Sequence, residues 1–190
     1  MKAGILSIAL ALMLVLSSFL PLLADDTGTI TITMTGADEI SITLSKTSWG
    51  PEDAAGTGIV SSDTTYLTSP PIEWCKLTNT GNANVNTFVV GEDAKWVNNS
   101  AYKWTLSSNG TNGDNIYGLW FRISGDTTRG PNHDGYVPIT TTQDEFWPYS
   151  GGSSLAPGAT KQFGLKLLTP TLFHGGREMR THITINAVAA

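Results

Sequence analysis

The chain has 190 residues, which is enough for one domain of ordinary size but not for two well-buried cores. Its 11 Lys and Arg against 16 Asp and Glu give a net charge of -5, so no basic surface for nucleic acid is expected. Only 14% of the residues are charged, while 20 are Gly and 9 are Pro, a composition that favours strands and turns over helices. We therefore expect an all-β protein.

Residues 1–24 have the pattern of a secretory signal peptide. Lys2 supplies the positive start, an apolar run follows from Ile5 to Leu16, and we expect cleavage after Ala24. Residues 25–190 are then expected to form a single domain that is secreted and extracellular or held at the cell surface, with no membrane segment left after cleavage.

Two alternatives for this leader stay open. If Ile5–Ala24 is not removed, it is about as long as a membrane-spanning helix needs to be. Lys2-Ala3-Gly4 resembles the processing site of archaeal type IV pilins, and cleavage there would retain Ile5–Ala24 as an assembly helix.

The clearest strand pattern is near the start of this domain, where Thr alternates with Ile or Met from Thr29 to Thr35. Glu39–Ser45 repeats the pattern, with Ile40, Ile42 and Leu44 predicted to point inward. The other predicted strands are Ile72–Asn79, Asn84–Val90, Tyr102–Ser107, Ile116–Ser124, Thr160–Thr169 and Thr181–Ala187. About eight strands separated by turn residues are typical of a two-sheet sandwich.

Three weaker segments complete the prediction. Thr47–Pro71 is read as a long loop with one short strand near Gly58–Ser61, and Ala94-Lys95-Trp96 as one helical turn. Phe146-Trp147-Pro148-Tyr149 is placed in a loop flanked by Gly and Ser.

The most apolar strand, Ile116–Ser124, is expected to be central and buried on both sides. We predict that the core is centred on its residues and on those of the strand that begins at Thr160, namely Tyr117, Leu119, Phe121, Ile123, Phe163, Leu165 and Leu167. Cys75, the only cysteine, cannot form an intrachain disulfide and is predicted to be a buried, unreactive thiol.

Two turn motifs carry a resemblance to known proteins. Leu77-Thr78-Asn79-Thr80-Gly81-Asn82 and the later Leu155-Ala156-Pro157-Gly158-Ala159-Thr160, followed by an alternating strand, resemble immunoglobulin-like domains of prokaryotic cell-surface proteins. The chain also looks like camelysin-like biofilm fibre subunits, which implies one immunoglobulin-like or jelly-roll sandwich and a strand donated to the next subunit. Trp104-Thr105-Leu106 is similar to the W-x-L triplet of cell-wall-binding domains, although a second triplet is absent and one strand face also explains it.

The free start of the domain makes the alternating segment a candidate for strand donation, through Thr29, Ile30, Thr31, Ile32, Thr33 and Met34. Its apolar side chains would fill a groove, and Gly36 would let the chain swing outward. The same segment would equally suit an edge strand of its own sheet. Donation would make identical subunits the partners in a polymer.

We expect no enzyme, because the sequence has no Gly-x-Ser-x-Gly elbow, no His-Glu-x-x-His motif and no glycine loop for phosphate. No cofactor is expected. Two oxygen-rich loops contain Asp114, and Asp126 with Asp134, and they are weak candidates for Ca²⁺. Neither loop has the spacing of an EF-hand, and turns rich in Asn, Asp and Gly explain both.

Two further surface features are open to interpretation. Trp147 and Tyr149 would offer stacking surfaces for carbohydrate, such as a cell-surface glycan, if they are exposed. Asn98-Asn99-Ser100 and Asn109-Gly110-Thr111 are sequons, so Asn98 and Asn109 are candidate glycosylation sites. The expected function is a structural filament or surface-layer subunit, with a carbohydrate-binding or adhesive module and a pilin-like protein as alternatives.

Overall fold

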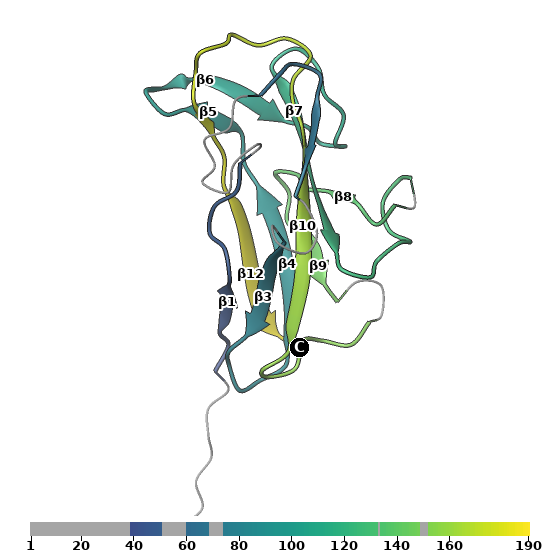
Figure 1. Cartoon of the computed structure of the whole chain (residues 1–190). Helices are drawn as coiled ribbons and strands as arrows, with labels where there is room; N and C mark the ends of the chain where they lie inside the picture. The colour runs from purple at the N-terminus through teal and green to yellow at the C-terminus, as the bar shows by residue number, and fades with distance from the viewer. Residues whose placement is uncertain (1–38, 51–59, 69–73, 133, 149–151) are drawn as a thin grey trace, which may run out of the picture. The chain divides into compact units, whose positions relative to one another are not determined.

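The computed structural model describes residues 39–50, 60–68, 74–132, 134–148 and 152–190 (Figure 1). The chain divides into two units, Met1–Gly36 and Ala37–Ala190, and all described residues belong to the second. They form twelve strands in two sheets, with no helix among them. The predicted class, an all-β two-sheet sandwich, is confirmed.

The larger sheet has the strand order β1-β3-β10-β7-β6-β5-β11, and β2 also pairs with β10 and β8 with β7. Its strands are β1 (Ile42–Leu44), β2 (Thr65–Leu67), β3 (Cys75–Asn79), β5 (Ala94–Trp96), β6 (Asn99–Leu106), β7 (Ile116–Ile123), β8 (Val137–Pro138), β10 (Thr160–Leu168) and β11 (Met179–Arg180). β6 and β7 are parallel and pair only through Thr105 with Ile116 and Leu106 with Tyr117. The β5–β6 hairpin therefore continues the sheet past the end of β7 (Figure 1).

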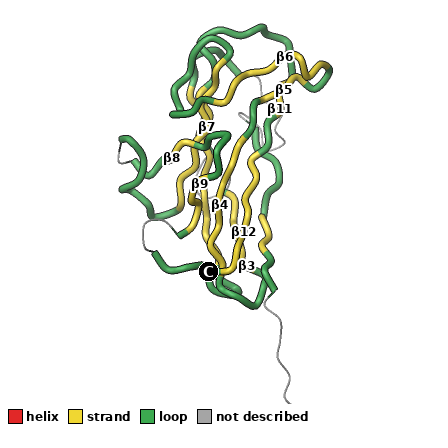
Figure 2. Tube along the Cα trace, turned by 180° about the vertical axis from the view of Figure 1, so that it is seen from behind, coloured by secondary structure: helices red, strands yellow, loops and turns green. Residues whose placement is uncertain are grey.

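The smaller sheet has the order β12-β4-β9 and consists of β4 (Val85–Gly91), β9 (Asp144–Trp147) and β12 (Ile183–Ala189). β12 pairs antiparallel with all of β4, from Ile183 opposite Gly91 to Ala189 opposite Val85 (Figure 2). Alternate residues of β4 are buried, as a strand with one face on the core requires.

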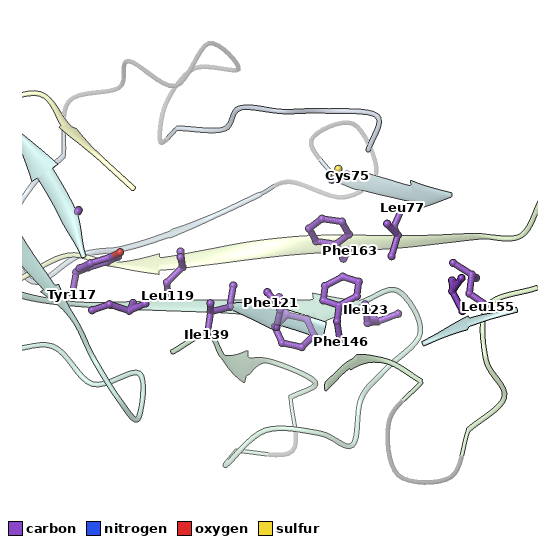
Figure 3. Close-up of a cluster of buried hydrophobic side chains, with 14 of the residues drawn as sticks. Cys75, Leu77, Tyr117, Leu119, Phe121, Ile123, Ile139, Phe146, Leu155 and Phe163 are labelled. Carbon is purple, nitrogen blue, oxygen red and sulfur yellow. The ribbon is translucent and has the colours of Figure 1, made fainter. Parts of the chain in front are cut away.

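The core lies between the sheets and is rich in aromatic side chains (Figure 3). The Phe146 ring of β9 stacks on Phe121 of β7 with centroids 4.8 Å apart, and it meets Phe163 of β10 edge-on at 5.0 Å. The predicted core is confirmed at Tyr117, Leu119, Phe121, Ile123 and Phe163, all of which are buried. Leu165 and Leu167 are only partly buried, although they pack against the same cluster.

β7 is buried on both faces, as predicted. Its outward-facing Trp120 is 7% exposed, and the indole Nε1 donates a hydrogen bond of 3.2 Å to the carbonyl of Gly110. Gly110 has a φ of +82°, and a Cβ there would lie 2.1 Å from the Trp120 ring. Only glycine lets this loop cover the outer face of the strand so closely.

Two predictions of local structure are wrong. Ala94-Lys95-Trp96 is strand β5 and not a helical turn, because it pairs with β6 and β11. Phe146 and Trp147 belong to strand β9 and not to a loop, because Phe146 is drawn into the core and is 0% exposed.

Other segments begin or end later than predicted. β1 begins at Ile42, which leaves Ile40 45% exposed instead of inward-facing. Val60 and Ser61 are not in a strand, Gly58 and Ile59 lie outside the described residues, and the strand in this region is β2 at Thr65–Leu67. Seven of the predicted strands lie in the described residues, as β1, β3, β4, β6, β7, β10 and β12. Five further strands of two to four residues, β2, β5, β8, β9 and β11, bring the number to twelve.

Candidate functional site

β12 is the outer strand of the smaller sheet, and no described residue pairs with its second edge. Ile183, Ile185 and Ala187 point toward the core but are only partly buried. By contrast, Val85 and Val89 on the neighbouring strand β4 are 0% and 1% exposed. Within the described part of the chain, the inner face of β12 is thus incompletely covered and its backbone edge is available for pairing.

β1 is the corresponding outer strand of the larger sheet, since it pairs with β3 alone among the described strands. Ile42 and Leu44 pack against the core and are also only partly buried. We call β1 and β12, Ile42–Leu44 and Ile183–Ala189, the open edge.

Contacts between the sheets place both strands of the open edge on the same side of the sandwich. At one side, β9 faces β7 and β10 through Phe146. In the middle, Leu155 bridges to Val85 of β4, and its carbonyl accepts a hydrogen bond of 2.8 Å from Asn79 Nδ2 of β3. Because β3 faces β4, the next strand outward is β1 in the larger sheet and β12 in the smaller sheet.

A hydrogen-bonded turn fixes one end of the open edge. Asn79 is fully buried, donates from Nδ2 to the carbonyls of Ala83 and Leu155, and accepts from the Gly81 amide. The Glu39 amide donates to Asn82 Oδ1 in the same turn, and the Ala190 amide donates to the Asn84 carbonyl. The start of the β1 segment and the end of β12 therefore meet at this turn.

A second group of hydrogen bonds holds the chain just before β12. Thr181 Oγ1 donates to the Glu92 carbonyl at 2.8 Å, and the Tyr117 hydroxyl lies 2.5 Å from the same oxygen. Burial raises the pKa of the Tyr117 hydroxyl well above its usual range. The hydrogen bond from exposed His182 to the Glu92 carboxylate lowers the pKa of Glu92. These hydrogen bonds hold the chain just before β12, and β12 itself pairs with β4 along its length. No described residue pairs with its other edge.

The strand-donation residues Thr29, Ile30, Thr31, Ile32, Thr33 and Met34 lie outside the described residues. Their predicted role stays a prediction. Sequence reasoning foresaw strands at both sides of the open edge, but it did not identify them as outer strands. The alternation of apolar and polar residues shows which face is buried but not which strand lacks a neighbour.

Among the described residues, the acidic side chains of these two loops are not grouped as the ligands of a cation. Asp126 is buried and accepts hydrogen bonds from the Arg129 guanidinium and from the amides of Thr128 and Arg129. Burial alone would raise the pKa of the Asp126 carboxyl, but these bonds outweigh it and the pKa is lowered. Among the described residues no group of three His, Cys, Asp or Glu side chains is placed to hold a metal ion, and Asp114 is exposed.

Asp134 forms a long ion pair with Lys166, at 3.8 Å. The Lys166 Nζ lies 4.2 Å from the Trp120 ring centre and 4.4 Å from that of Tyr136. Desolvation by these neighbours lowers the pKa of Lys166. The stacked side chains fasten the 126–136 loop to the outer face of the sheet.

Of the two aromatic residues predicted to offer stacking surfaces for carbohydrate, the structure describes one. Trp147 is partly buried, packs against the core, and has the Lys161 ammonium 3.9 Å from its ring centre. Tyr149 lies outside the described residues. Trp104 and Leu106 are buried on the same face of β6, which is the strand-face explanation of their triplet.

The remaining candidates are placed as follows. Asn98 is exposed in the turn between β5 and β6, and Asn109 is exposed in the loop that covers Trp120. Cys75 is buried, as predicted.

No protein-family model and no curated protein matches this sequence. In the part of the chain that the structure describes, no helix has the length and apolar character needed to cross a membrane.

Proposed function

We propose that this protein is a secreted, non-enzymatic structural subunit that polymerises at the cell surface by β-strand donation. The observation that carries the proposal is the open edge, where Ile183, Ile185 and Ala187 face the core without full cover. The donated segment is Thr29–Met34, whose Ile30, Ile32 and Met34 supply the missing apolar side chains.

The match between the segment and the edge supports this proposal in three ways. β12 has seven residues and no described residue pairs with its outer edge, and the alternating segment Thr29–Thr35 has the same length. A strand with apolar residues on one face and Thr on the other covers a core and still meets water. Each side chain that becomes fully buried contributes roughly 1.5–3 kcal/mol, so three of them favour association strongly.

The connection between the alternating segment and the sandwich is short and is compatible with donation. Glu39 is held at the end of the sandwich by Asn82, which is where β12 also ends. Only Gly36–Asp38 separates the alternating segment from this point, and three residues span at most about 11 Å. Gly36 in this connection permits the segment to extend away from its own sandwich. A segment that leaves in this way meets the open edge of a second copy, and repetition of the contact gives a filament unless a ring closes.

The test is deletion of Asp25–Thr35 from the mature chain. We expect the full chain to form filaments in negative-stain electron micrographs and the truncated chain to elute as a monomer in size-exclusion chromatography. A synthetic Asp25–Thr35 peptide should bind the truncated monomer and raise its melting temperature. Full-length protein that stays monomeric at high concentration, or truncated protein that still polymerises, would refute donation.

Two point variants provide matched controls on the two faces of the segment. Ile32→Asp places a charge on the face that fills the groove and should abolish polymers. Thr31→Asp places the same charge on the opposite face and should leave polymers intact. If both variants polymerise equally, the alternating face is not what recognises the open edge.

A further inference from the structure

The tip of the β5–β6 hairpin brings a sequon next to an aromatic cluster that the core does not need. Val97 and Asn98 form the turn, Trp96 lies directly opposite Asn99 in the ladder, and a bulge precedes this pair. Asn98 and Ser100, the first and third residues of the sequon, are both exposed. The modification site is therefore on the surface at the tip of a two-stranded projection (Figure 1).

Trp96 of β5 is held in place by neighbours on β6 and β11 and in the loop before β11. Its ring meets Tyr102 of β6 edge-on, with centroids 5.7 Å apart. The Arg177 guanidinium lies 3.7 Å from the Tyr102 ring centre and 5.1 Å from that of Trp96. Met179 of β11 pairs with Trp96 through the backbone. The indole is thus fixed beside the turn, and the cluster stays open to solvent at Tyr102, which is 44% exposed.

We propose that Asn98 carries an N-linked glycan whose first sugar packs on Trp96. A pyranose ring has an apolar face of C–H groups, and an aromatic ring two residues before the modified Asn in a hairpin turn offers a flat surface to that face. The residue pattern is Trp96-Val97-Asn98-Asn99-Ser100, so the aromatic ring and the acceptor are both supplied by one turn. This inference does not depend on the proposed strand donation.

The modification itself needs a polyisoprenoid-linked oligosaccharide as the donor. The bond between the first sugar's C1 and the lipid phosphate oxygen breaks, and a bond between C1 and Asn98 Nδ2 forms. The amide nitrogen loses one proton, and the polyisoprenoid phosphate or pyrophosphate leaves with the bonding electrons. No oxidant or reductant is required.

The second sequon lies in a tight turn beside a buried aromatic ring. Asn109 Oδ1 accepts hydrogen bonds from the Thr111 amide, the Thr111 hydroxyl and the Ser107 hydroxyl, which close a tight turn. The adjacent Gly110 is packed against Trp120, whose ring is buried beneath the loop. The ring beside Asn109, that of Trp120, is buried and cannot stack on a sugar, which makes this site the internal control.

The experiment is expression of the full chain in a secreting yeast, followed by glycopeptide mass spectrometry. We expect a glycan on Asn98 that is lost in Ser100→Ala. Trimming with an endoglycosidase that leaves one sugar should keep the melting temperature, whereas complete removal by an amidase should lower it by about 2–4 °C. In Trp96→Leu this difference between the two enzymes should vanish, and in Trp96→Tyr it should persist.

Two outcomes of these measurements would contradict the proposed glycan on Asn98. An unmodified Asn98 in the secreted protein, or equal melting temperatures after the two enzymes in the native sequence, would overturn the proposal. The measurement in Thr111→Ala, which removes the other sequon, assigns the shift to Asn98. If Trp96→Leu does not fold, the comparison of the two enzymes in the native sequence and in Ser100→Ala, which lacks the sugar, still decides whether the first sugar stabilises the fold.

Discussion

The ring of Phe146 lies stacked on the ring of Phe121, with centroids 4.8 Å apart and planes inclined by 27°. Phe146 belongs to β9 of the smaller sheet and Phe121 to β7 of the larger one, so this contact joins the two sheets (Figure 3). Both side chains are 0% exposed. The pair lies at the centre of the core, and the inward-facing side chains of β1 and β12 pack against the same core.

Replacing Phe121 with Ala should lower the free energy of unfolding by about 3–5 kcal/mol, because it leaves a cavity and removes the stack on Phe146. Leu165→Ala should cost less, since Leu165 is only partly buried. Urea denaturation followed by tryptophan fluorescence measures both variants. A Phe121→Ala protein with the stability of the wild type would contradict this placement of the core.

Asn79→Asp should lower the free energy of unfolding by about 2–3 kcal/mol, because the buried carbonyls of Ala83 and Leu155 lose their shared donor. The side chain keeps its size, so the effect reports the lost hydrogen bonds and the burial of a carboxyl group beside two carbonyls, and not packing. Asn84→Asp, at an exposed position in the same turn, is the matched control and should change stability little. Equal effects of the two substitutions would show that the Asn79 network is not what holds the turn.

Asp126→Asn should destabilise the protein at pH 7 by about 3 kcal/mol, because it leaves the charge of Arg129 without its buried carboxylate. The lowered pKa of Asp126 also fixes the direction of a pH effect. A carboxyl whose pKa is lower in the folded state stabilises the fold above its ordinary value of 3.8, and this contribution is lost as the pH falls further.

The stability of the wild type should therefore fall more steeply than that of Asp126→Asn as the pH drops below about 5. Denaturation curves between pH 7 and pH 2 measure this difference. Asp114→Asn, at an exposed loop position, should follow the wild type. Parallel stability curves for the wild type and Asp126→Asn would be inconsistent with the lowered pKa.

The sequence predicted the long strands well because their side chains alternate. Ile116–Ser124 and Thr160–Thr169 each carry enough apolar residues to show which face is buried, and both appear as β7 and β10. Ala94-Lys95-Trp96 was misread because three residues are too few to show a period, and Ala and Lys favour helices in isolation. Its strand conformation depends on β6 and β11, which are contacts from distant parts of the chain.

The open edge was less predictable than its strands. Strand alternation indicates that Ile183 and Ile185 face inward, but their partial exposure follows from the position of β12 at the end of its sheet. That position is set by which strands pair, and pairing is not encoded in any one segment. The buried position of Phe146 was equally hard to predict from the sequence. Its Gly, Ser and Pro neighbours are typical of a loop, although the ring is central to the core.

The most direct test of strand donation is disulfide trapping between the alternating segment and β12. In a Cys75→Ala background, one Cys is introduced at Thr184 or Asn186, which are exposed on β12. A second Cys is introduced at Thr29, Thr31 or Thr33, which the sequence alternation predicts to lie on the polar face of the segment. Pairs combined in one chain and oxidised mildly report whether the segment reaches β12 of the same or of another subunit.

We predict a ladder of covalent multimers on a non-reducing gel for at least one pair, and covalent dimers when two single-Cys proteins are mixed. Reduction should collapse both products to monomers. If every pair that reacts yields only an internally cross-linked monomer, the segment completes its own sheet and strand donation is wrong.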